Sequence, residues 1–258
     1  MGGGMGDGAV NVDRSGRKIT GSQKLPERIA WQIARDLVDE GIAPGGMLLS
    51  EAEMVERYGV GRASVREALR ILEFLGLIVL RPGPGGGPRW IGVDTRHVGK
   101  SLTAHLHLRG ATFGDVLEAR MVIEPVIARL AAEQASEGGL AALEVFVDSP
   151  QPDPTLLPSM HASAATEFHG LVAGIPRNPV LQLFAQAVRH IYGERQQDLT
   201  FPDAERQRVL DEHVEIAQEI LAGNGARAEA MMREHMDEFG RFAEDRHPGM
   251  LDERVDWY

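Results

Sequence analysis

Two histidines stand at equal distances from a predicted turn in the last third of the chain. His213 lies 11 residues before Asn224, and His235 lies 11 residues after it. If two antiparallel helices meet at this turn, both imidazoles lie ~16 Å from it, at about 1.5 Å per residue. The helical neighbours of both residues are apolar. We therefore expect both rings to point into a helical bundle at the same level.

A third histidine, His169, lies in the apolar stretch EFHGLV. Imidazole is a ligand of Zn²⁺ and similar divalent ions, and side chains on facing helices build metal sites inside bundles. The alternative is that each histidine is a hydrogen-bonded residue of the core. The spacing leaves both interpretations open: a metal site made by His169, His213 and His235, or a polar patch in the core.

Three arginines recur every four residues in the stretch GRASVREALR: Arg62, Arg66 and Arg70. At ~100° per residue they share one face of a helix, whereas Val65 and Leu69 share the opposite face. A guanidinium group can bind a phosphate, or the O6 and N7 atoms of guanine, with two hydrogen bonds. The alternative is a solvated helix face whose charge is balanced by neighbouring glutamates. The elements around the arginines favour the first interpretation.

These elements predict a winged helix-turn-helix. Apolar spacing and caps predict three helices, and a hydrophobic run on each side of a glycine-rich tip predicts a β-hairpin. The expected elements are a helix over 25–40, a short helix from the capping pair Ser50 and Glu53 to Tyr58, a helix over about 63–75, and strands at 77–80 and 89–93. The outline places the arginines on the helix that enters a DNA groove.

The hairpin tip RPGPGGGP supplies a flexible wing beside this helix. Gly85 and Gly86 allow the backbone to approach a phosphate or a minor groove without a side-chain clash. Arg81 and Arg89 flank the tip, and Ser64 follows the first arginine of the helix. We expect these five residues to extend the DNA-binding surface.

The rest of the chain predicts an all-helical domain. Helices are expected within 96–109 and 112–135 and over 160–173, 178–197, 203–222 and 226–245, with a Pro-rich loop at 148–158. The predicted fold class is therefore mainly α. The predicted domains are a disordered leader at 1–22, a winged helix-turn-helix at 23–93, a helical bundle at 94–245 and a tail at 246–258.

The charge is divided unequally between these domains. Residues 1–100 carry 14 Lys and Arg against 12 Asp and Glu, whereas residues 101–258 carry 13 against 26, and the whole chain has a net charge of −11. An anionic partner should therefore meet the first hundred residues. The chain has no cysteine, and we expect no disulfide, membrane span or secretory signal and a cytoplasmic location.

Residues 24–91 resemble the N-terminal domain of the GntR family of bacterial transcription regulators. The resemblance rests on GRASVREALRILEFLGLI and on the glycine-rich RPGPGGG behind it. It implies that Arg62 and Arg66 contact bases or phosphates of double-stranded DNA. Two positions depart from the family pattern, since Ala52 replaces a usual arginine and Gly61 replaces a usual serine or threonine.

Residues 97–242 resemble the FCD effector domain of the FadR subfamily. The resemblance rests on FGDVLEARMVIEPVIARLAAE, EFHGLVAGIPRNPVL and DEHVEIAQEILAGNGARAEAMMREHM. It implies a divalent metal, Zn²⁺ or similar, although Ala165 stands where metal-binding members carry an aspartate. It also implies that an acidic effector meets a cation. The expected effector-binding residues are Arg120, His169, His190, Tyr192, His213 and His235. For Arg120, a surface salt bridge to Glu124 is the alternative.

Together these features predict a ligand-responsive regulator and not an enzyme. A homodimer would place two recognition helices on an inverted repeat. A small organic acid or acyl derivative would shift the equilibrium between two arrangements of the dimer. Two alternatives are a helical domain that only dimerises and a histidine–metal hydrolase. The hydrolase lacks an HExxH pairing and a glutamate placed as a base beside His169.

Overall fold

The computed structural model describes residues 24–83, 85–135, 138–150, 158–196 and 201–256, and only the backbone of 158–165, 194–196 and 203. The predicted leader and most of the Pro-rich loop lie outside the described residues. The chain divides into two compact units, unit 1 over Met1–Asp94 and unit 2 over Thr95–Tyr258. None of the helices in the described part is long and apolar enough to cross a membrane.

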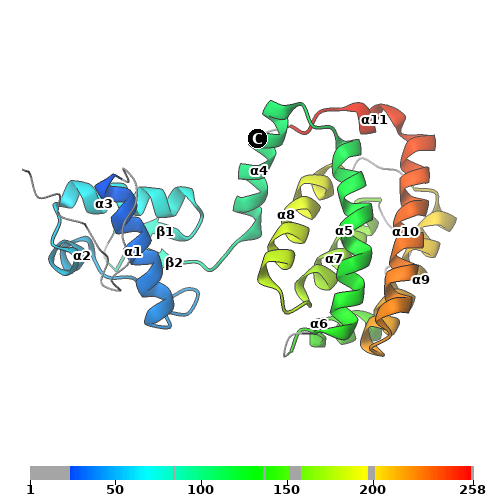
Figure 1. The fold of residues 1–258 in the computed structure, drawn as a ribbon, viewed down its shortest axis with the longest axis horizontal. Coiled ribbons are helices and arrows are strands. Elements are labelled where there is room, and N and C mark those ends of the chain that lie inside the picture. The colour runs from blue at the N-terminus through cyan, green and yellow to red at the C-terminus, as the bar shows by residue number, and fades with distance from the viewer. Residues whose placement is uncertain (1–23, 84, 136–137, 151–157, 197–200, 257–258) are drawn as a thin grey trace, which may run out of the picture. The chain divides into compact units, whose positions relative to one another are not determined.

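Unit 1 is a winged helix-turn-helix, as predicted, with three helices followed by an antiparallel hairpin in its described part (Figure 1). Its elements are α1 (Leu25–Asp39), α2 (Glu51–Tyr58), α3 (Arg62–Phe74), β1 (Ile78–Arg81) and β2 (Gly87–Trp90). One apolar cluster joins them. Ile33 on α1, Leu69 on α3 and Ile78 on β1 are each at most 2% exposed. Burial of this stripe of α3 turns its other face to solvent.

The start of α2 is fixed by the predicted capping box. The Ser50 hydroxyl accepts a hydrogen bond from the Glu53 backbone N–H, and the Glu53 carboxylate accepts one from the Ser50 N–H at 2.7 Å. The helix ends at Gly59, whose φ of 63° lies in the left-handed region that glycine adopts without strain. These two caps set the length of α2 and the turn into α3.

We expect Ser50→Ala to lower the free energy of unfolding of unit 1 by about 1 kcal/mol, because the first turn of α2 loses its side-chain acceptor. Urea unfolding followed by tryptophan fluorescence measures this change. The matched variant Ser50→Thr keeps the hydroxyl that accepts from the Glu53 N–H and donates to the Glu53 carboxylate, and should stay close to the unsubstituted protein. Equal losses in both variants would contradict a role for the cap.

The hairpin begins and ends at slightly different residues than the sequence predicts. Gly87 and Pro88 belong to β2 and not to the tip, since they pair with Arg81 and Leu80. The Pro88 carbonyl also accepts a hydrogen bond from the Leu48 N–H. The segment before α2 therefore supports β2 from its other side and extends the strand toward the tip.

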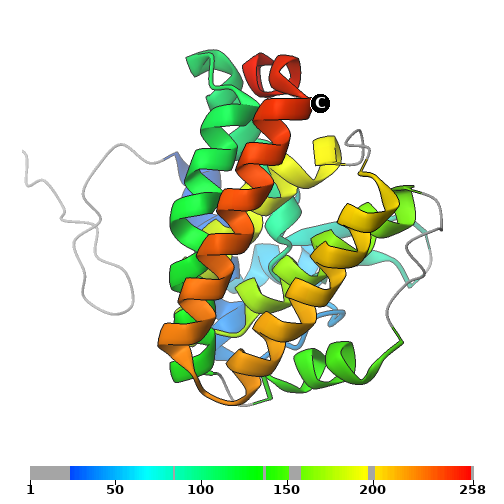
Figure 2. The same cartoon turned by 90° about the vertical axis from the view of Figure 1, so that its right-hand side faces the viewer.

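Unit 2 is an all-helical bundle in its described part. Its helices are α4 (Thr95–Arg109), α5 (Phe113–Glu133), α6 (Ala141–Asp148), α7 (Pro158–Gly174), α8 (Pro179–Gln196), α9 (Asp203–Leu221), α10 (Gly225–Arg246) and α11 (Pro248–Asp252). The long helices α5 and α10 run side by side in both views (Figures 1 and 2). The short turn between α9 and α10 falls where the sequence predicts it. Helix α6 has no counterpart in the sequence prediction.

The segment over 246–258, predicted as a tail, is folded against unit 2 in its described part. Helix α11 follows α10 directly, and the chain then returns to the junction of α4 and α5. There the Phe113 N–H donates to the Glu253 carbonyl, and the Val255 N–H donates to the Ala111 carbonyl. Val255 is only 1% exposed. Together with Met250 and Leu251, which also pack against the core, this burial explains why the segment is folded where a tail was expected.

Candidate functional site

The three histidines of the sequence prediction meet inside unit 2. His169 on α7, His213 on α9 and His235 on α10 are each at most 5% exposed. The Nε2 atom of His235 lies 3.2 Å from Nε2 of His213 and 3.4 Å from Nε2 of His169. One ring nitrogen from each residue lies within 4.8 Å of the other two. The helices thus direct three potential ligand atoms at one point.

Two carboxylates face the opposite ring nitrogens. Nδ1 of His235 lies 2.8 Å from Glu212, and Nδ1 of His169 lies 2.5 Å from Glu124. Burial works to raise the pKa of Glu212, but His235 and Arg208 outweigh it and hold the pKa below its usual value. An ionised carboxylate only accepts hydrogen bonds, so the proton of each ring belongs on Nδ1. The Nε2 lone pairs of His235 and His169 then point at each other.

This arrangement fits a bound metal ion. Two Nε2 lone pairs at 3.4 Å repel each other unless a cation lies between them. In a tetrahedral zinc site with Zn–N bonds of ~2.0–2.1 Å, the nitrogens are about 3.3 Å apart. Two of the three separations between the histidines, 3.2 and 3.4 Å, match this value, and the ligand atoms all lie within 4.8 Å of one another. Carboxylates behind ligand imidazoles are also the usual outer partners of a metal site. The donor set therefore suits Zn²⁺ or a similar ion.

Glu124 is held by a buried cation as well as by His169. Nε of Arg120, one turn earlier on α5, lies 2.6 Å from the Glu124 carboxylate. Burial works to raise the pKa of Glu124, but Arg120 and His169 outweigh it and hold the pKa well below its usual range. Burial also lowers the pKa of His169 to about 4, against the opposing effect of Glu124. At neutral pH, His169 is therefore an uncharged imidazole that is able to bind a metal.

Besides the three histidines, the expected effector-binding residues are Arg120, Tyr192 and His190. Arg120 forms an ion pair with Glu124, the contact that the sequence offered as the alternative to effector binding. The pair is buried and not on the surface, since the Arg120 side chain is 4% exposed. Its guanidinium also lies over the Tyr192 ring, 4.8 Å from the centroid. Burial raises the pKa of Tyr192 to about 12. His190 is half-buried on α8, with its Cβ against Gly99 of α4.

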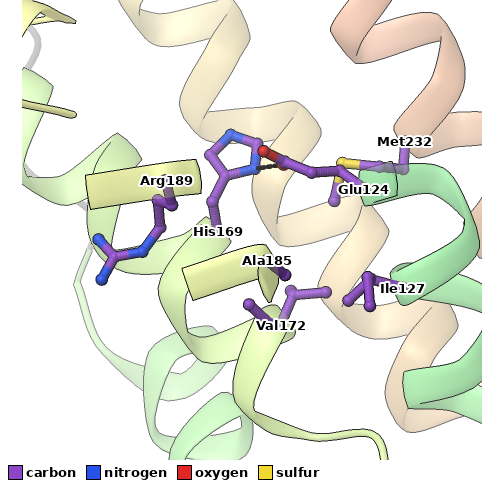
Figure 3. A pocket seen from close by; sticks show the side chains of 8 residues that line it. Glu124, Ile127, His169, Val172, Ala185, Arg189 and Met232 are labelled. Atoms are coloured by element: carbon purple, nitrogen blue, oxygen red, sulfur yellow. Dashed lines mark ion pairs between the residues drawn. The ribbon is translucent and has the colours of Figure 1, made fainter. Parts of the chain in front are cut away.

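A small pocket opens beside His169 and Glu124 (Figure 3). Its other lining residues are mostly apolar, among them Ile127 and Val172, and Arg189 of α8 stands at its edge. In Figure 3 the Arg189 guanidinium points away from Glu124. The pocket thus joins an apolar wall to the histidine cluster, and its free volume of about 10 Å³ is the space of about one water molecule.

The sequence indicated no glutamate beside His169, but Glu124 contacts that ring, and the contact of Glu212 with His235 was not foreseen either. Glu167, two residues before His169 in the chain, is exposed. The i,i+4 spacing gave the pair of Arg120 and Glu124, and the largely apolar helix around them was the signal that this pair is buried. Glu212 precedes His213, yet it contacts His235 of the neighbouring helix. The side chain of Ala165 lies outside the described residues.

Glu124→Gln should weaken metal binding by ~10–100-fold, the usual effect of removing an outer carboxylate partner of a histidine ligand. The full chain would be titrated with Zn²⁺ against a chelating dye. The matched control is Glu118→Gln, an exposed position on the same helix. Circular dichroism would show that both variants fold. Equal zinc affinities for the two variants would contradict the role assigned to Glu124.

The predicted arginine row is exposed on α3. Arg62 forms no ion pair within the described part of the chain, and the Arg66 and Arg70 side chains are 63% and 74% exposed. Arg66 contacts Glu51 at 2.9 Å, whereas Arg70 lies 3.6 Å from Glu67 on its own helix. Helix α3 has no side-chain cap at Gly61, so its first backbone N–H groups stay open to an anion.

The remaining predicted DNA contacts differ in exposure. Arg81 and Gly85 are exposed at the wing, Gly86 is half-buried near the tip, and Ser64 is half-buried on α3. Arg89 is engaged within unit 1, since its Nη1 atom donates to the Gly45 carbonyl at 3.1 Å. Arg81 is therefore the freer of the two wing arginines.

The two units define a class of protein. A winged helix-turn-helix with an exposed arginine row is a DNA-binding unit, and the helical unit carries a histidine cluster beside a pocket. Residues 25–86 match the family described as "Bacterial regulatory proteins, gntR family", and residues 115–238 match the FCD domain. The chain therefore belongs to the GntR family of DNA-binding transcription regulators, with an FCD domain, and is not an enzyme.

Relatives of known sequence and structure agree with this assignment. The chain is 31% identical to the uncharacterized HTH-type transcriptional regulator Rv0494 of Mycobacterium tuberculosis, over 83% of this chain and 88% of the relative. It is 28% identical to the HTH-type transcriptional regulator LutR of Bacillus subtilis, over 83% and 97%. A solved GntR structure of Streptococcus agalactiae is 25% identical, with a TM-score of 0.63, and covers 84% of this chain and 100% of that chain.

Proposed function

We propose that this regulator is a metal-dependent sensor of a small organic acid. A divalent ion held by His169, His213 and His235 would offer an electrophilic centre for an anionic oxygen of the effector. The convergence of the three Nε2 atoms supports this proposal more than any other observation. With Ala165 in place of the usual aspartate, water or an effector carboxylate would complete the ligand set.

We also propose that the regulator binds an inverted repeat as a homodimer. Arg62 and Arg66 of each copy would contact bases or phosphates in the major groove, and the wing around Arg81 and Gly85 would lie along the backbone. The exposed arginine row and the open N-terminus of α3 support these contacts. Effector binding would change DNA affinity to the extent that the effector binds the two arrangements of the dimer unequally.

The experiment combines metal analysis with DNA binding by the full chain. Duplexes selected by the protein from a random-sequence pool serve as the DNA probe. A panel of small carboxylates, such as acetate, lactate and citrate, is added to zinc-loaded and chelator-stripped protein. We expect at least one of them to change DNA affinity of the zinc-loaded protein by about 5–150-fold and to have no effect on the stripped protein. Equal effects with and without metal would contradict the proposal, as would a protein that binds no metal.

A further inference from the structure

A glutamate on α2 contacts the central arginine of the exposed row on α3. Oε2 of Glu51 lies 2.9 Å from Nε of Arg66. Glu51 is the first residue of α2 and Arg66 lies in the second turn of α3, so the contact joins the two helices of the helix-turn-helix. Both side chains are partly exposed, at 41% and 63%, and such a pair contributes little to stability. Its significance must be sought in binding.

The contact uses only one of the three guanidinium nitrogens. The bond engages Nε, and the two terminal nitrogens of Arg66 bond to nothing in the part of the chain that the structure describes. Contact at Nε restricts rotation of the guanidinium plane while the terminal fork stays available. Two hydrogen bonds from an arginine to O6 and N7 of guanine require a defined orientation of this plane.

Glu51 is itself held in place. The capping box between Ser50 and Glu53 fixes the first turn of α2 around Glu51. The other two arginines of the row have no comparable partner. Arg62 has no ion pair among the described residues, and Arg70 lies 3.6 Å from Glu67 within its own helix. Arg66 is thus the member of the row that is oriented from a second helix.

We propose that Glu51 is a positioning residue that orients Arg66 to read a guanine in the major groove. The inference rests on the proposed contact of Arg66 with DNA. A carboxylate near the phosphate backbone repels DNA of any sequence, so Glu51 should weaken non-specific binding. In the complex, exclusion of water strengthens the Glu51–Arg66 contact. Glu51 should therefore act in opposite directions on specific and non-specific affinity.

The experiment compares Glu51→Ala with Glu51→Gln in the full chain. Both variants remove the charge, but only glutamine keeps an oxygen that can accept from Arg66 Nε. The probes are a duplex selected by the unsubstituted protein from a random-sequence pool and a scrambled duplex of equal length, at one salt concentration. A third probe replaces the guanines of the selected duplex one at a time by 7-deazaguanine, which lacks the N7 acceptor. Thermal unfolding shows that both variants fold.

We expect Glu51→Ala to lower the ratio of specific to scrambled affinity about 10-fold, within the range for one bidentate base contact. Glu51→Gln should stay within ~3-fold of the unsubstituted ratio, because the acceptor remains. At one guanine, the 7-deazaguanine penalty should shrink in Glu51→Ala. Equal gains of both variants on both duplexes would overturn the proposal and leave Glu51 as a repelling charge alone.

Arg66→Ala separates this inference from the proposed function. If Arg66→Ala lowers the affinity ratio but Glu51→Ala does not, Arg66 reads DNA without help from Glu51, and only the positioning role fails. If Arg66→Ala leaves the ratio unchanged, the assignment of Arg66 to the DNA contact fails as well. A Glu51→Ala effect on the ratio of specific to scrambled affinity that persists in the Arg66→Ala background would also overturn the proposal, because that effect must pass through Arg66.

Discussion

His235→Ala is expected to abolish stoichiometric metal binding by the helical unit. His235 lies within 3.4 Å of both other Nε2 atoms, so its removal takes away the nitrogen at the centre of the cluster. The loss of affinity should exceed the ~10–100-fold effect of an outer carboxylate. After dialysis, metal content measured by elemental analysis should fall from about one ion per chain to near zero, as a site with only two protein ligands is incomplete.

The same variant changes how a chelator acts on stability. A metal that binds only the folded state adds about 2.7 kcal/mol at a concentration 100-fold above its Kd. A chelator should therefore lower the Tm of the unsubstituted protein and leave that of His235→Ala unchanged. The control is His105→Ala, an exposed histidine on α4, which should behave as the unsubstituted protein does. A histidine cluster that served only as a core patch would show no chelator effect in any of the three proteins.

The second large effect is expected from the double variant Arg62→Ala/Arg66→Ala. Each arginine that contacts a base contributes about 1–3 kcal/mol to specific binding. The double variant should therefore lose at least ~30-fold in affinity for the selected duplex. Each phosphate contact that is removed should also lower the slope of log affinity against log salt by about 1. Fluorescence anisotropy over a range of salt concentrations measures both quantities.

A charge-matched control separates local contacts from the overall charge. Arg109→Ala/Arg241→Ala removes two positive charges from exposed positions of unit 2. It should leave the affinity for the selected duplex within ~2-fold, because both arginines belong to the helical unit and not to the DNA-binding unit. Equal losses in the two double variants would show that α3 is not the recognition helix.

The fold could be predicted from the sequence wherever a helix has one apolar face and one polar face. Helices α1 and α3 have such a pattern together with glycines near their ends, whereas the largely apolar α5 was marked by its capping pair Thr112 and Asp115; each begins and ends within about two residues of its prediction. Helix α6 was missed because its eight residues are mostly apolar, and so short an apolar run cannot be assigned to a helix or a strand from its pattern. The C-terminal segment is ordered by packing of Met250, Leu251 and Val255 against helices that lie far from it in the sequence.

The candidate metal site was also predictable only in part. The equal spacing of His213 and His235 from the turn depends only on helix geometry, and the structure brings these residues together. The partners Glu124 and Glu212 depend on how α5 and α9 are rotated against their neighbours. That rotation is decided by packing across the whole bundle and cannot be read from one helix. Sequence reasoning therefore found the imidazoles and missed the carboxylates behind them.

The buried Val255 has a consequence for protein engineering. Its N–H and carbonyl groups bond to Ala111 and to His107, so the chain there completes the junction between α4 and α5. Trimming a few amino acids from this end would uncover an apolar slot and leave the Ala111 carbonyl without its donor. Purification tags and fluorescent fusions are therefore better joined ahead of Lys24.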